Sequence, residues 1–540
     1  MLDNKSGKTD QEEFQSGGRS CQSISRTGLL FVLAVTAVLS TLAGCAGGPL
    51  AALASSPGGR ITKGPCLLRV YQDRAALMWE TDGEGPWSVR CETEGRPESH
   101  HDSDQAERLH DAYVHKVWID GLEPGRRYRY RIVGPSGRSE TYEFRTVPAK
   151  TDEVRFVVYG DTRTNVSVHR RLVEQIMKHE LDFVVHVGDL VARGDEYRQW
   201  GPQFFEPMKG LVERVPLYIA KGNHEGRNGT YEKLLLPPGE HGDVGFDYGP
   251  LHLFCADNVS QRADANDLAL NIARDARASE APWKFVIYHV PSVNFGGHWS
   301  SWRQQETLPA FAKAGVDFVV TGHSHHYERF RPVAPLGQGH YVTYITSGGG
   351  GAPLYDVEPT AHHAFAKSVY QFCLFHIKGD TLTMDTIGVD GRIIDHIKVV
   401  KEDGQPDKQY VQAAVPMGGI QLHTLLYENL AVRLPERPKK GSPFAVNVDL
   451  VVPELPDDAK LTFKLQGDSE AYDLPPIRMI AVPRRGGPVR VELTATPSVA
   501  VRSTGSGKAA RMEPSLQLEC RYEIGEIRET ISRPVTVADD

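Results

Sequence analysis

The chain has 540 residues, which is more than one hydrophobic core usually serves, so we expect two or three domains. Its content of 40% hydrophobic and 24% charged residues is that of an ordinary globular protein. A formal net charge of −8 provides no basic stripe and excludes nucleic acid as an expected partner. A site for phosphate would therefore draw its positive potential from bound metal rather than from net charge.

The first 45 residues have the pattern of an export signal. Arg19 and Arg26 precede the apolar segment 29–39, and small residues then lead to Cys45. This segment resembles a bacterial lipoprotein signal, which implies that Cys45 is lipidated and becomes the first mature residue. We therefore expect an exported protein, tethered by this lipid to a membrane of the bacterial cell envelope on its periplasmic or extracellular face. A plain membrane-spanning anchor over 29–46 is the alternative.

Residues 46–60 are small and rich in Gly and Pro, which predicts a flexible tether, and residues 61–148 then read as a β-rich domain. Short alternating runs with no helix signal predict a small β-sandwich. The histidines and aspartates of 100–110 could be taken for a metal site, but we interpret them as a solvated loop. The predicted strands are Cys66–Tyr71, Ala75–Glu80, Trp87–Glu92, Tyr113–Ile119 and Tyr128–Ile132.

The cysteines limit the metal and redox chemistry that the chain can support. They form no CxxC pair, which excludes a structural zinc ribbon. An odd number outside the cytosol permits a disulfide without demanding one. In the N-terminal region the alternatives are a Cys66–Cys91 pair and two free thiols.

Residues 150–400 alternate strand-like runs with helical patterns, which predicts an α/β domain with right-handed crossovers. Helices are predicted at Val168–Lys178, with Asn165 or Ser167 available as a cap, and at Gln304–Ala314. We expect antiparallel additions to the sheet at 246–248, 251–256, 342–347, 369–377 and 381–387.

Residues 401–412 are charged and turn-rich, which predicts a linker and suggests that the tail could be removed. Residues 413–540 alternate again and predict a C-terminal β-sandwich-like domain of unknown role and unknown protein partner. Within it, residues 500–512 read as a loop. The clearest predicted strands are Phe444–Val452, Lys460–Leu465 and Val489–Ala495.

Five apolar runs in the central domain each end in residues that can bind a divalent metal. Such runs read as buried strands, and parallel strands present their carboxyl ends at a shared edge, where open α/β sheets bind their ligands. Candidate ligands at these ends would therefore converge. The runs are Val154–Tyr159 before Gly160-Asp161, Phe183–Val187 before Gly188-Asp189, Val215–Ala220 before Gly222-Asn223-His224-Glu225, Trp283–Tyr288 before His289, and Val316–Thr321 before Gly322-His323-Ser324-His325.

This order of ligands predicts a two-metal hydrolase. Two cations about 3.5–4 Å apart can polarise a phosphoryl oxygen together, but they need an anion between them. Asp189 is the candidate bridge. Mixed carboxylate, amide and imidazole donors suit two divalent or trivalent ions of Fe, Zn or Mn. Asp161 and His325 would complete the first ion's ligands, and Asn223, His289 and His323 would complete the second's.

The ordered blocks resemble the calcineurin-like metallophosphoesterases. The continuation His326-Tyr327-Glu328-Arg329 and the preceding sandwich are similar to the purple acid phosphatase branch. Over about residues 60–400 the resemblance implies a fibronectin type III-like β-sandwich followed by an α/β metallophosphoesterase sandwich of two mixed sheets flanked by helices. It also implies that His224 contacts the transition-state oxygens near the leaving group. His298 matches a substrate-facing histidine of that branch, although a surface histidine is the alternative.

Two positions depart from the family pattern. Many members place a histidine where Arg163 stands, and purple acid phosphatases place an iron-binding tyrosine where Ala192 stands. The first ion therefore lacks one protein ligand, and we expect a colourless protein with a weaker or exchangeable first site. Arg163 could grip phosphate oxygens beside the metals, or it could neutralise Asp161 or another carboxylate.

Together these features predict a multidomain α/β plus β protein that acts as an exported, membrane-tethered phosphoesterase of the acid phosphatase type. By the resemblance, it would hydrolyse small-molecule phosphate esters through attack of a metal-bound hydroxide. One alternative is a phosphodiesterase or nucleotidase of the same fold. The other is a non-catalytic surface binding module with a depleted metal site.

Overall fold

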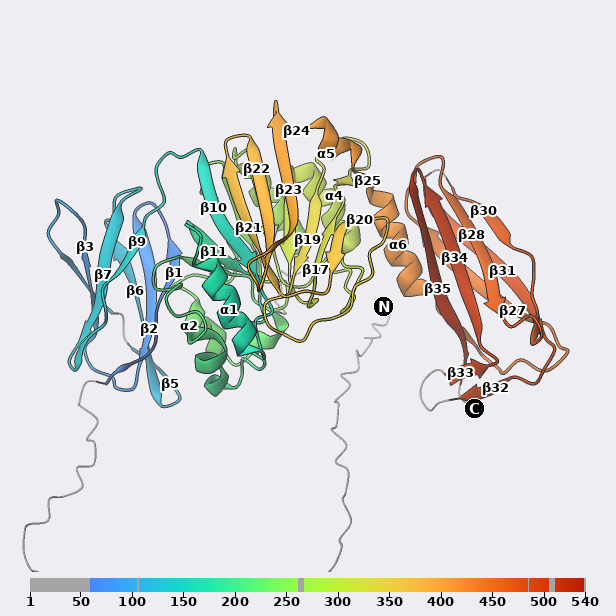
Figure 1. Ribbon diagram of the computed structural model, residues 1–540, viewed down its shortest axis with the longest axis horizontal. Coiled ribbons are helices and arrows are strands. Elements are labelled where there is room, and N and C mark those ends of the chain that lie inside the picture. Colours follow the sequence, from blue (N-terminus) through green and yellow to red (C-terminus); the bar gives the residue numbers. More distant parts are fainter. Residues whose placement is uncertain (1–58, 104–105, 261–266, 484, 505–509, 539–540) are drawn as a thin grey trace, which may run out of the picture. The chain divides into compact units, whose positions relative to one another are not determined.

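The computed structural model describes residues 59–103, 106–260, 267–483, 485–504 and 510–538 (Figure 1). The predicted signal segment with Cys45, and the tether up to residue 58, lie outside these residues. Across the described ranges, no helix has the length and apolar character needed to cross a membrane.

The N-terminal domain is an antiparallel β-sandwich, as predicted. One sheet has the order β1-β2-β6-β5, and the other has the order β4-β3-β7-β8 with β9 on β7. In β7, Tyr128, Tyr130 and Ile132 are buried and the arginines between them point away, as strand alternation requires. The strands are β1 (Ile61–Val70), β2 (Arg74–Thr81), β3 (Ser88–Glu92), β4 (Ser99–Asp102), β5 (Glu107–Leu109), β6 (Ala112–Asp120), β7 (Arg127–Gly134), β8 (Gly137–Arg138) and β9 (Tyr142–Arg145).

One detail of this domain corrects a prediction, and another selects between two alternatives for the cysteines. The loop prediction is wrong at residues 99–102, because these form β4 and pair with β3, while His100 contacts Asp102 on its own strand. Cys66 and Cys91 are free, buried thiols. Cys66 packs in the cluster shared with the central domain and Cys91 packs inside the sandwich, so the two thiols face different cores.

The central domain contains two mixed sheets packed face to face (Figure 1). One has the order β12-β11-β10-β21-β22-β23-β24, and the other has the order β13-β14-β15-β16-β19-β17-β20. Aromatic rings fill the space between them: Phe156 of β10 meets Phe285 of β15 edge-on, with ring centroids 5.4 Å apart. The first sheet's strands are β10 (Glu153–Tyr159), β11 (Phe183–His186), β12 (Leu217–Ile219), β21 (Gln371–Lys378), β22 (Thr381–Gly388), β23 (Ile393–Glu402) and β24 (Gln405–Pro406).

Helices cover the outer faces of both sheets and complete the predicted layers. Leu172, Val173 and Ile176 of α1 pack with residues of β10 and β11, and Asn165 caps this helix by accepting the backbone N–H of Val168. Residues of α3 and α4 pack on the second sheet. The elements are α1 (Val166–Ile176), α2 (Thr230–Leu235), α3 (Leu268–Ala278), α4 (Gln304–Ala314), β13 (Val244–Tyr248), β14 (Leu251–Cys255), β15 (Trp283–Ile287), β16 (Phe318–Thr321), β17 (Tyr327–Phe330), β18 (Val333–Ala334), β19 (Thr343–Ser347) and β20 (His363–Lys367).

Two predictions about this domain need correction. Antiparallel addition is confirmed for β13, β21 and β22, but it holds for only one edge of β14 and of β19. β14 is antiparallel to β13 and parallel to β15, and β19 is antiparallel to β17 and parallel to β16. The predicted linker at 401–412 is instead ordered structure. It contains the end of β23, β24 and a helix, α5 (Lys408–Gln412), whose cap Asp407 accepts the N–H of Tyr410, a buried residue.

The C-terminal domain is a β-sandwich, as predicted. One sheet has the order β30-β28-β34-β35-β33-β32 with β26 on β35, and the other has the order β27-β31-β29. The loop predicted for 500–512 is wrong at both ends, because β32 covers residues 502–504 and β33 covers residues 510–513. β25 (Val415–Pro416) pairs in parallel with β18 and belongs to neither sheet of this sandwich. The strands of the sandwich are β26 (Val432–Leu434), β27 (Phe444–Val452), β28 (Lys460–Gly467), β29 (Tyr472–Asp473), β30 (Arg478–Ala481), β31 (Gly487–Pro497), β32 (Arg502–Thr504), β33 (Ala510–Glu513), β34 (Leu516–Ile524) and β35 (Ile527–Val537).

A helix that the sequence analysis missed, α6 (Met417–Asn429), joins this sandwich to the central domain (Figure 1). It contacts α4 on one side and β27 and β35 on the other. Its apolar residues belong to the same buried cluster as Leu308 and Phe311 of α4 and Val446 of β27. One hydrophobic core therefore spans the proposed boundary, which argues against a removable tail.

A chain that ends at residue 405 should lose stability. Ile420, Leu422 and Leu426 of α6 are fully buried, and each buried aliphatic side chain is worth about 1.5–3 kcal/mol. We expect the truncated chain to aggregate or to melt well below the full chain in circular dichroism. As a control, Val451→Ser changes a strand residue that is 71% exposed and should leave melting unaffected. Identical melting of the truncated and full chains would show that the tail is an independent module.

Candidate metal centre

The candidate ligands all follow the carboxyl ends of strands, and they come from both sheets. Asp161 follows β10, Asp189 follows β11, and Asn223 begins a short 3-10 turn after β12. His289 follows β15, and His323 follows β16. The centre therefore lies where the carboxyl-end edges of the two sheets meet, with the first three residues supplied by one sheet and the others by its neighbour.

One group of donor atoms converges closely enough to hold a single cation. The Oδ1 atom of Asn223 lies 3.0 Å from Nε2 of His289 and 3.0 Å from Nδ1 of His323, and these two ring nitrogens are 3.3 Å apart. Oδ1 of Asp189 lies 3.3 Å from Nε2 of His289. His289 donates its Nδ1–H to the carbonyl of Val187 at 2.7 Å, which leaves the lone pair of Nε2 directed at the group.

A second group lies beside the first. Oδ1 of Asp161 is 3.6 Å from Nε2 of His325, whose Nδ1–H is donated to the carbonyl of Pro353 at 2.8 Å. Asp161 is fully buried and accepts the backbone N–H of His323 at 3.0 Å. Carboxylate oxygens of Asp161 and Asp189 and a ring nitrogen of His289 lie within 4.8 Å of one another, so the two groups are contiguous.

The imidazoles of the centre are held in their neutral, metal-binding form. Burial, followed by the neighbouring His289 and His298, lowers the pKa of His323 to about 2. Burial, followed by the charge of Arg163, lowers the pKa of His325 to about 4. Neutral imidazole is the form that binds a metal ion, so protons do not compete for these nitrogens near neutral pH.

The two carboxylates are buried side by side, an arrangement that a cation would stabilise. Burial, followed by the neighbouring Asp189, raises the pKa of Asp161 well above its usual range. Burial would also raise the pKa of Asp189, but His289 and His224 beside it bring that pKa below its usual value. Asp189 is therefore the carboxylate that stays ionised, as a bridging ligand must.

Three of the candidate ligands have strained backbones. The φ angles of Asp161, Asp189 and His323 are 56°, 59° and 69°, in the left-handed region that costs roughly 1–3 kcal/mol for such residues. The glycines before the ligands permit close backbone approach: a Cβ on Gly222 would lie 2.3 Å from the backbone nitrogen of Asp189, and one on Gly322 would lie 2.5 Å from Oδ2 of Asp161. Strain of this kind is concentrated at functional sites.

The three candidate catalytic residues also lie at this centre. His224 donates Nδ1–H to the carbonyl of Ala192 at 2.6 Å and places Nε2 3.8 Å from Oδ2 of Asp189. His298 is exposed at the surface, and its ring stacks on that of His323 with centroids 4.2 Å apart. Nε of Arg163 lies 3.3 Å from Oδ2 of Asp189. The structure thus brings every predicted site residue of this domain together.

Two family models match the chain over these regions. Residues 154–327 match the model described as calcineurin-like phosphoesterase, and residues 69–146 match the N-terminal domain of purple acid phosphatase. The chain carries a calcineurin-like metallophosphoesterase domain behind a purple acid phosphatase N-terminal domain. The match to residues 154–327 includes all six candidate metal ligands, and the resemblance predicted from the motifs is confirmed.

Known relatives are similar to part of this chain. Purple acid phosphatase 21 of Arabidopsis thaliana is 28% identical over 265 residues, which cover 44% of this chain and 58% of that protein. Acid phosphatase type 7 of Homo sapiens is 24% identical over 339 residues, 54% of this chain and 77% of that protein. A purple acid phosphatase from yellow lupin (Lupinus luteus) seeds has a similar fold, with a TM-score of 0.52, 17% identity, and coverage of 66% of this chain and 75% of that chain. The chain thus spans less than two thirds of the first relative.

Glu225 supports the metallophosphoesterase centre from behind, a role that the sequence analysis did not assign. Its buried carboxylate accepts the backbone N–H groups of Asp189 and Leu190 at 2.8 Å each and that of Gly222 at 2.6 Å. Burial, followed by Asp189, raises the pKa of Glu225 to about 8, which these three donors oppose. Its place at the end of the Gly222-Asn223-His224-Glu225 block was the available signal. Glu225 joins the loop after β11 to the turn after β12.

The loop that carries His298 is held by helix α6 of the C-terminal part of the chain. Glu428 accepts a hydrogen bond from Nε1 of Trp299 at 3.2 Å and one from Oγ of Ser301 at 2.6 Å. The ring of Tyr427 stacks on Trp299 with centroids 3.6 Å apart. The C-terminal part therefore reaches the metal centre through one loop, in addition to its packing role.

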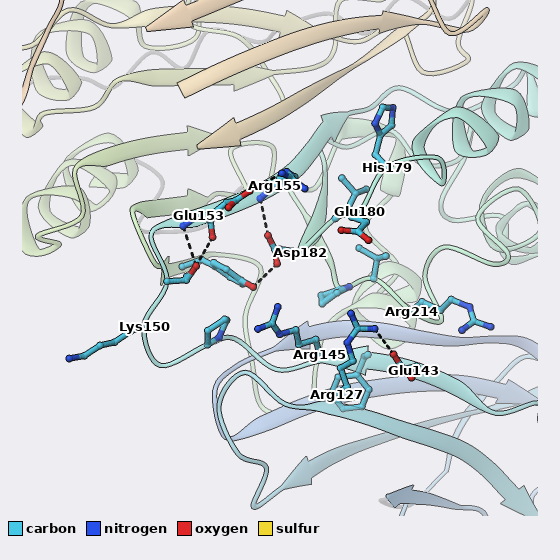
Figure 2. A pocket seen from close by; sticks show the side chains of 17 residues that line it. Arg127, Glu143, Arg145, Lys150, Glu153, Arg155, His179, Glu180, Asp182 and Arg214 are labelled. Atoms are coloured by element: carbon cyan, nitrogen blue, oxygen red, sulfur yellow. Dashed lines mark hydrogen bonds and ion pairs between the residues drawn. The ribbon is translucent and has the colours of Figure 1, made fainter. Parts of the chain in front are cut away.

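A cavity of about 510 Å³ lies at the opposite ends of the strands (Figure 2). Its lining residues Glu153, Asp182 and Pro216 lie at or just before the starts of β10, β11 and β12, whereas the metal ligands follow the ends of these strands. Charged side chains here pair with one another, as Arg127 does with Glu143 at 2.9 Å. This cavity is therefore separate from the metallophosphoesterase centre.

Removal of the Glu225 carboxylate should loosen the centre. Glu225→Ala leaves three buried N–H donors without their acceptor, and each such donor costs about 1–3 kcal/mol. We expect the free energy of unfolding to fall by about 3 kcal/mol or more in urea titrations, with a smaller loss for Glu225→Gln, which keeps one acceptor oxygen. Glu206→Ala at an exposed position should stay within about 0.5 kcal/mol of the parent. Equal stabilities of Glu225→Ala and the parent would contradict this role.

Proposed function

We propose that this protein is a metal-dependent phosphoester hydrolase of the acid phosphatase type. The observation that carries the proposal is the division of the Asp189 carboxylate between two donor groups. Oδ1 lies beside His289 in the group with Asn223 and His323, and Oδ2 lies toward the side of Arg163 and His325. A single carboxylate between two cation positions is the arrangement that dinuclear phosphoester hydrolases require.

The donor set is compatible with the metals expected from the sequence. Carboxylate, amide and imidazole donors suit Fe, Zn or Mn, and the thiols of the described residues are buried in hydrophobic clusters and are not among the converging donor atoms. Bound metal would supply Lewis acidity at a phosphoryl oxygen and a lowered pKa for water. We propose that the metal bound in the cell is Fe, Zn or Mn.

His224 is placed to donate a proton to a leaving group. The carbonyl of Ala192 accepts its Nδ1–H, which orients the ring and leaves Nε2 beside Asp189 and partly open to solvent. Proton donation from a positioned imidazole typically contributes roughly 10²–10⁴-fold to a rate.

Two further side chains would orient the substrate. His298 is exposed and stacks on His323, so its ring can donate a hydrogen bond to an oxygen of the ester. Arg163 has a side chain that is 16% exposed and can present N–H groups to phosphoryl oxygens. Arg163 supplies positive hydrogen-bond donors in a protein whose net charge is negative.

We further propose that the protein is exported and lipid-anchored at Cys45, which is supported by the basic flank, apolar segment and small residues before that cysteine. A small-molecule phosphoester would then be met outside the cytosol.

The absence of a tyrosine or histidine ligand beside the first group favours the non-catalytic binding module as the second candidate function.

The two candidates separate in one measurement. The full chain, supplied with Zn, Mn, Fe or Co, should hydrolyse mono-aryl phosphates and possess bound metal. Asp189→Asn removes the shared negative charge, and we expect it to lower metal content and to reduce turnover by roughly 10³-fold or more, because ligands and bridge are lost together. Metal quantification and phosphate release provide the two readouts. Absence of turnover with every metal would favour the binding module, and preferential cleavage of bis-aryl phosphates would indicate a diesterase.

The role of His224 predicts a dependence on the leaving group. His224→Asn should reduce kcat for phenyl phosphate by roughly 10²-fold or more, because phenolate needs a proton as it leaves. For 2,4-dinitrophenyl phosphate, whose leaving group needs no proton, we expect a loss of about tenfold or less. His179→Asn, at a histidine that lines the remote cavity, serves as the control and should leave both rates unchanged. Equal losses on the two substrates would assign His224 to binding instead.

A further inference from the structure

The guanidinium of Arg163 contacts the two side chains that a first metal ion would need. Its Nε lies 3.3 Å from Oδ2 of Asp189, and its Nη2 lies 3.4 Å from Nε2 of His325. Because His325 donates Nδ1–H to Pro353, its Nε2 carries a lone pair, and Nη2–H donates to that lone pair. The guanidinium therefore uses the same lone pair that a metal ion would use.

The contact with Asp189 has the same character. Oδ1 of this carboxylate accepts the backbone N–H of His224 at 3.0 Å and lies 3.3 Å from Nε2 of His289. Oδ2 is the oxygen that faces Arg163. A bridging carboxylate turns one oxygen toward each cation, so Arg163 stands at the oxygen that would face the first ion.

Charge and ligand supply disfavour a metal ion beside this guanidinium. Arginine keeps its proton at all ordinary pH values, so Arg163 cannot become a ligand, and a second cation in the same place would be repelled. Purple acid phosphatases place an iron-binding tyrosine at the position of Ala192. The methyl group of Ala192 cannot bind a metal ion, so this ligand is missing. At the other position, Asn223, His289 and His323 present unprotonated donor atoms with no cationic side chain among them.

We propose that the guanidinium of Arg163 takes the place of the first metal ion, so that the centre holds one ion and one fixed organic cation. The ion is bound by Asp189, Asn223, His289 and His323. Asp161, Asp189 and His325 then serve as the binding site of the guanidinium. The charge that a second metal would provide is supplied by the chain itself, and the remaining N–H groups of Arg163 are available to a phosphoryl oxygen.

This inference rests on the proposed metal centre and is tested by counting ions rather than by activity. The full chain is equilibrated with Zn²⁺ or Mn²⁺, freed of excess metal, and its metal content is measured by inductively coupled plasma mass spectrometry. We expect one ion per chain for the parent protein and two for Arg163→His, because a neutral imidazole replaces the cation and adds a ligand. Arg171→His, an exposed position on α1, controls for the added histidine and should stay at one.

Electron paramagnetic resonance of the Mn²⁺-loaded proteins gives a second readout. The parent should show the spectrum of an isolated ion, and Arg163→His should show that of a coupled pair. Two ions in the parent, or one ion in a folded Arg163→His, would overturn the inference. If Arg163→His fails to fold, the stoichiometry and the spectrum of the parent decide alone. A parent protein with two ions and full turnover would overturn this inference but support the proposed function. A parent protein with no bound ion would contradict both the inference and the proposed function.

Discussion

The ionised, buried carboxylate of Asp189 is the constraint on which the metal centre depends. It lies beside another buried carboxylate, Asp161, and next to imidazoles kept neutral by burial. A negative charge in such a place is tolerated only when cations or N–H donors surround it. The backbone N–H of His224 and the guanidinium of Arg163 provide these partners, so the chemistry of the site and the stability of its loops have the same electrostatic origin.

The architecture meets this constraint by joining two sheets at their carboxyl-end edges. Each sheet supplies half of the donors, and the aromatic layer between the sheets fixes their spacing. Glycines before the ligands let backbone segments approach the carboxylates, and Glu225 ties the loops after β11 and β12 together. The strain at three ligand residues is opposed by hydrogen bonds of the same residues, from the backbone N–H of Asp189 to Glu225 and from that of His323 to Asp161.

The domains on either side contribute more than attachment. Tyr130 of the N-terminal sandwich donates a hydrogen bond to the carbonyl of Glu213 in the central domain at 2.7 Å. At the other end, α6 lies within the same core as α4 and anchors the loop of His298. A substrate bound at the centre would therefore meet a residue whose position depends on the C-terminal part of the chain, which links the shape of the site to a domain absent from the matched family models.

The sequence by itself determined most of the strands and the order of the ligands, because these depend on local patterns: an apolar run, a glycine and a donor side chain. The sandwich of two mixed sheets was expected only from the resemblance that these motifs carry. The bounds of α4 followed from helical periodicity in the same way, whereas the sequence left Asn165 and Ser167 as alternative caps of α1 and the structure selects Asn165. Tertiary structure alone decided the parallel pairing of β14 and β19, the role of α6, whose apolar residues cover every face, and the ordered segment at 401–412. It also decided where Arg163 lies, since its two partners are 26 and 162 residues away along the chain. Contacts of that range depend on how the sheets pack, and no local pattern encodes them.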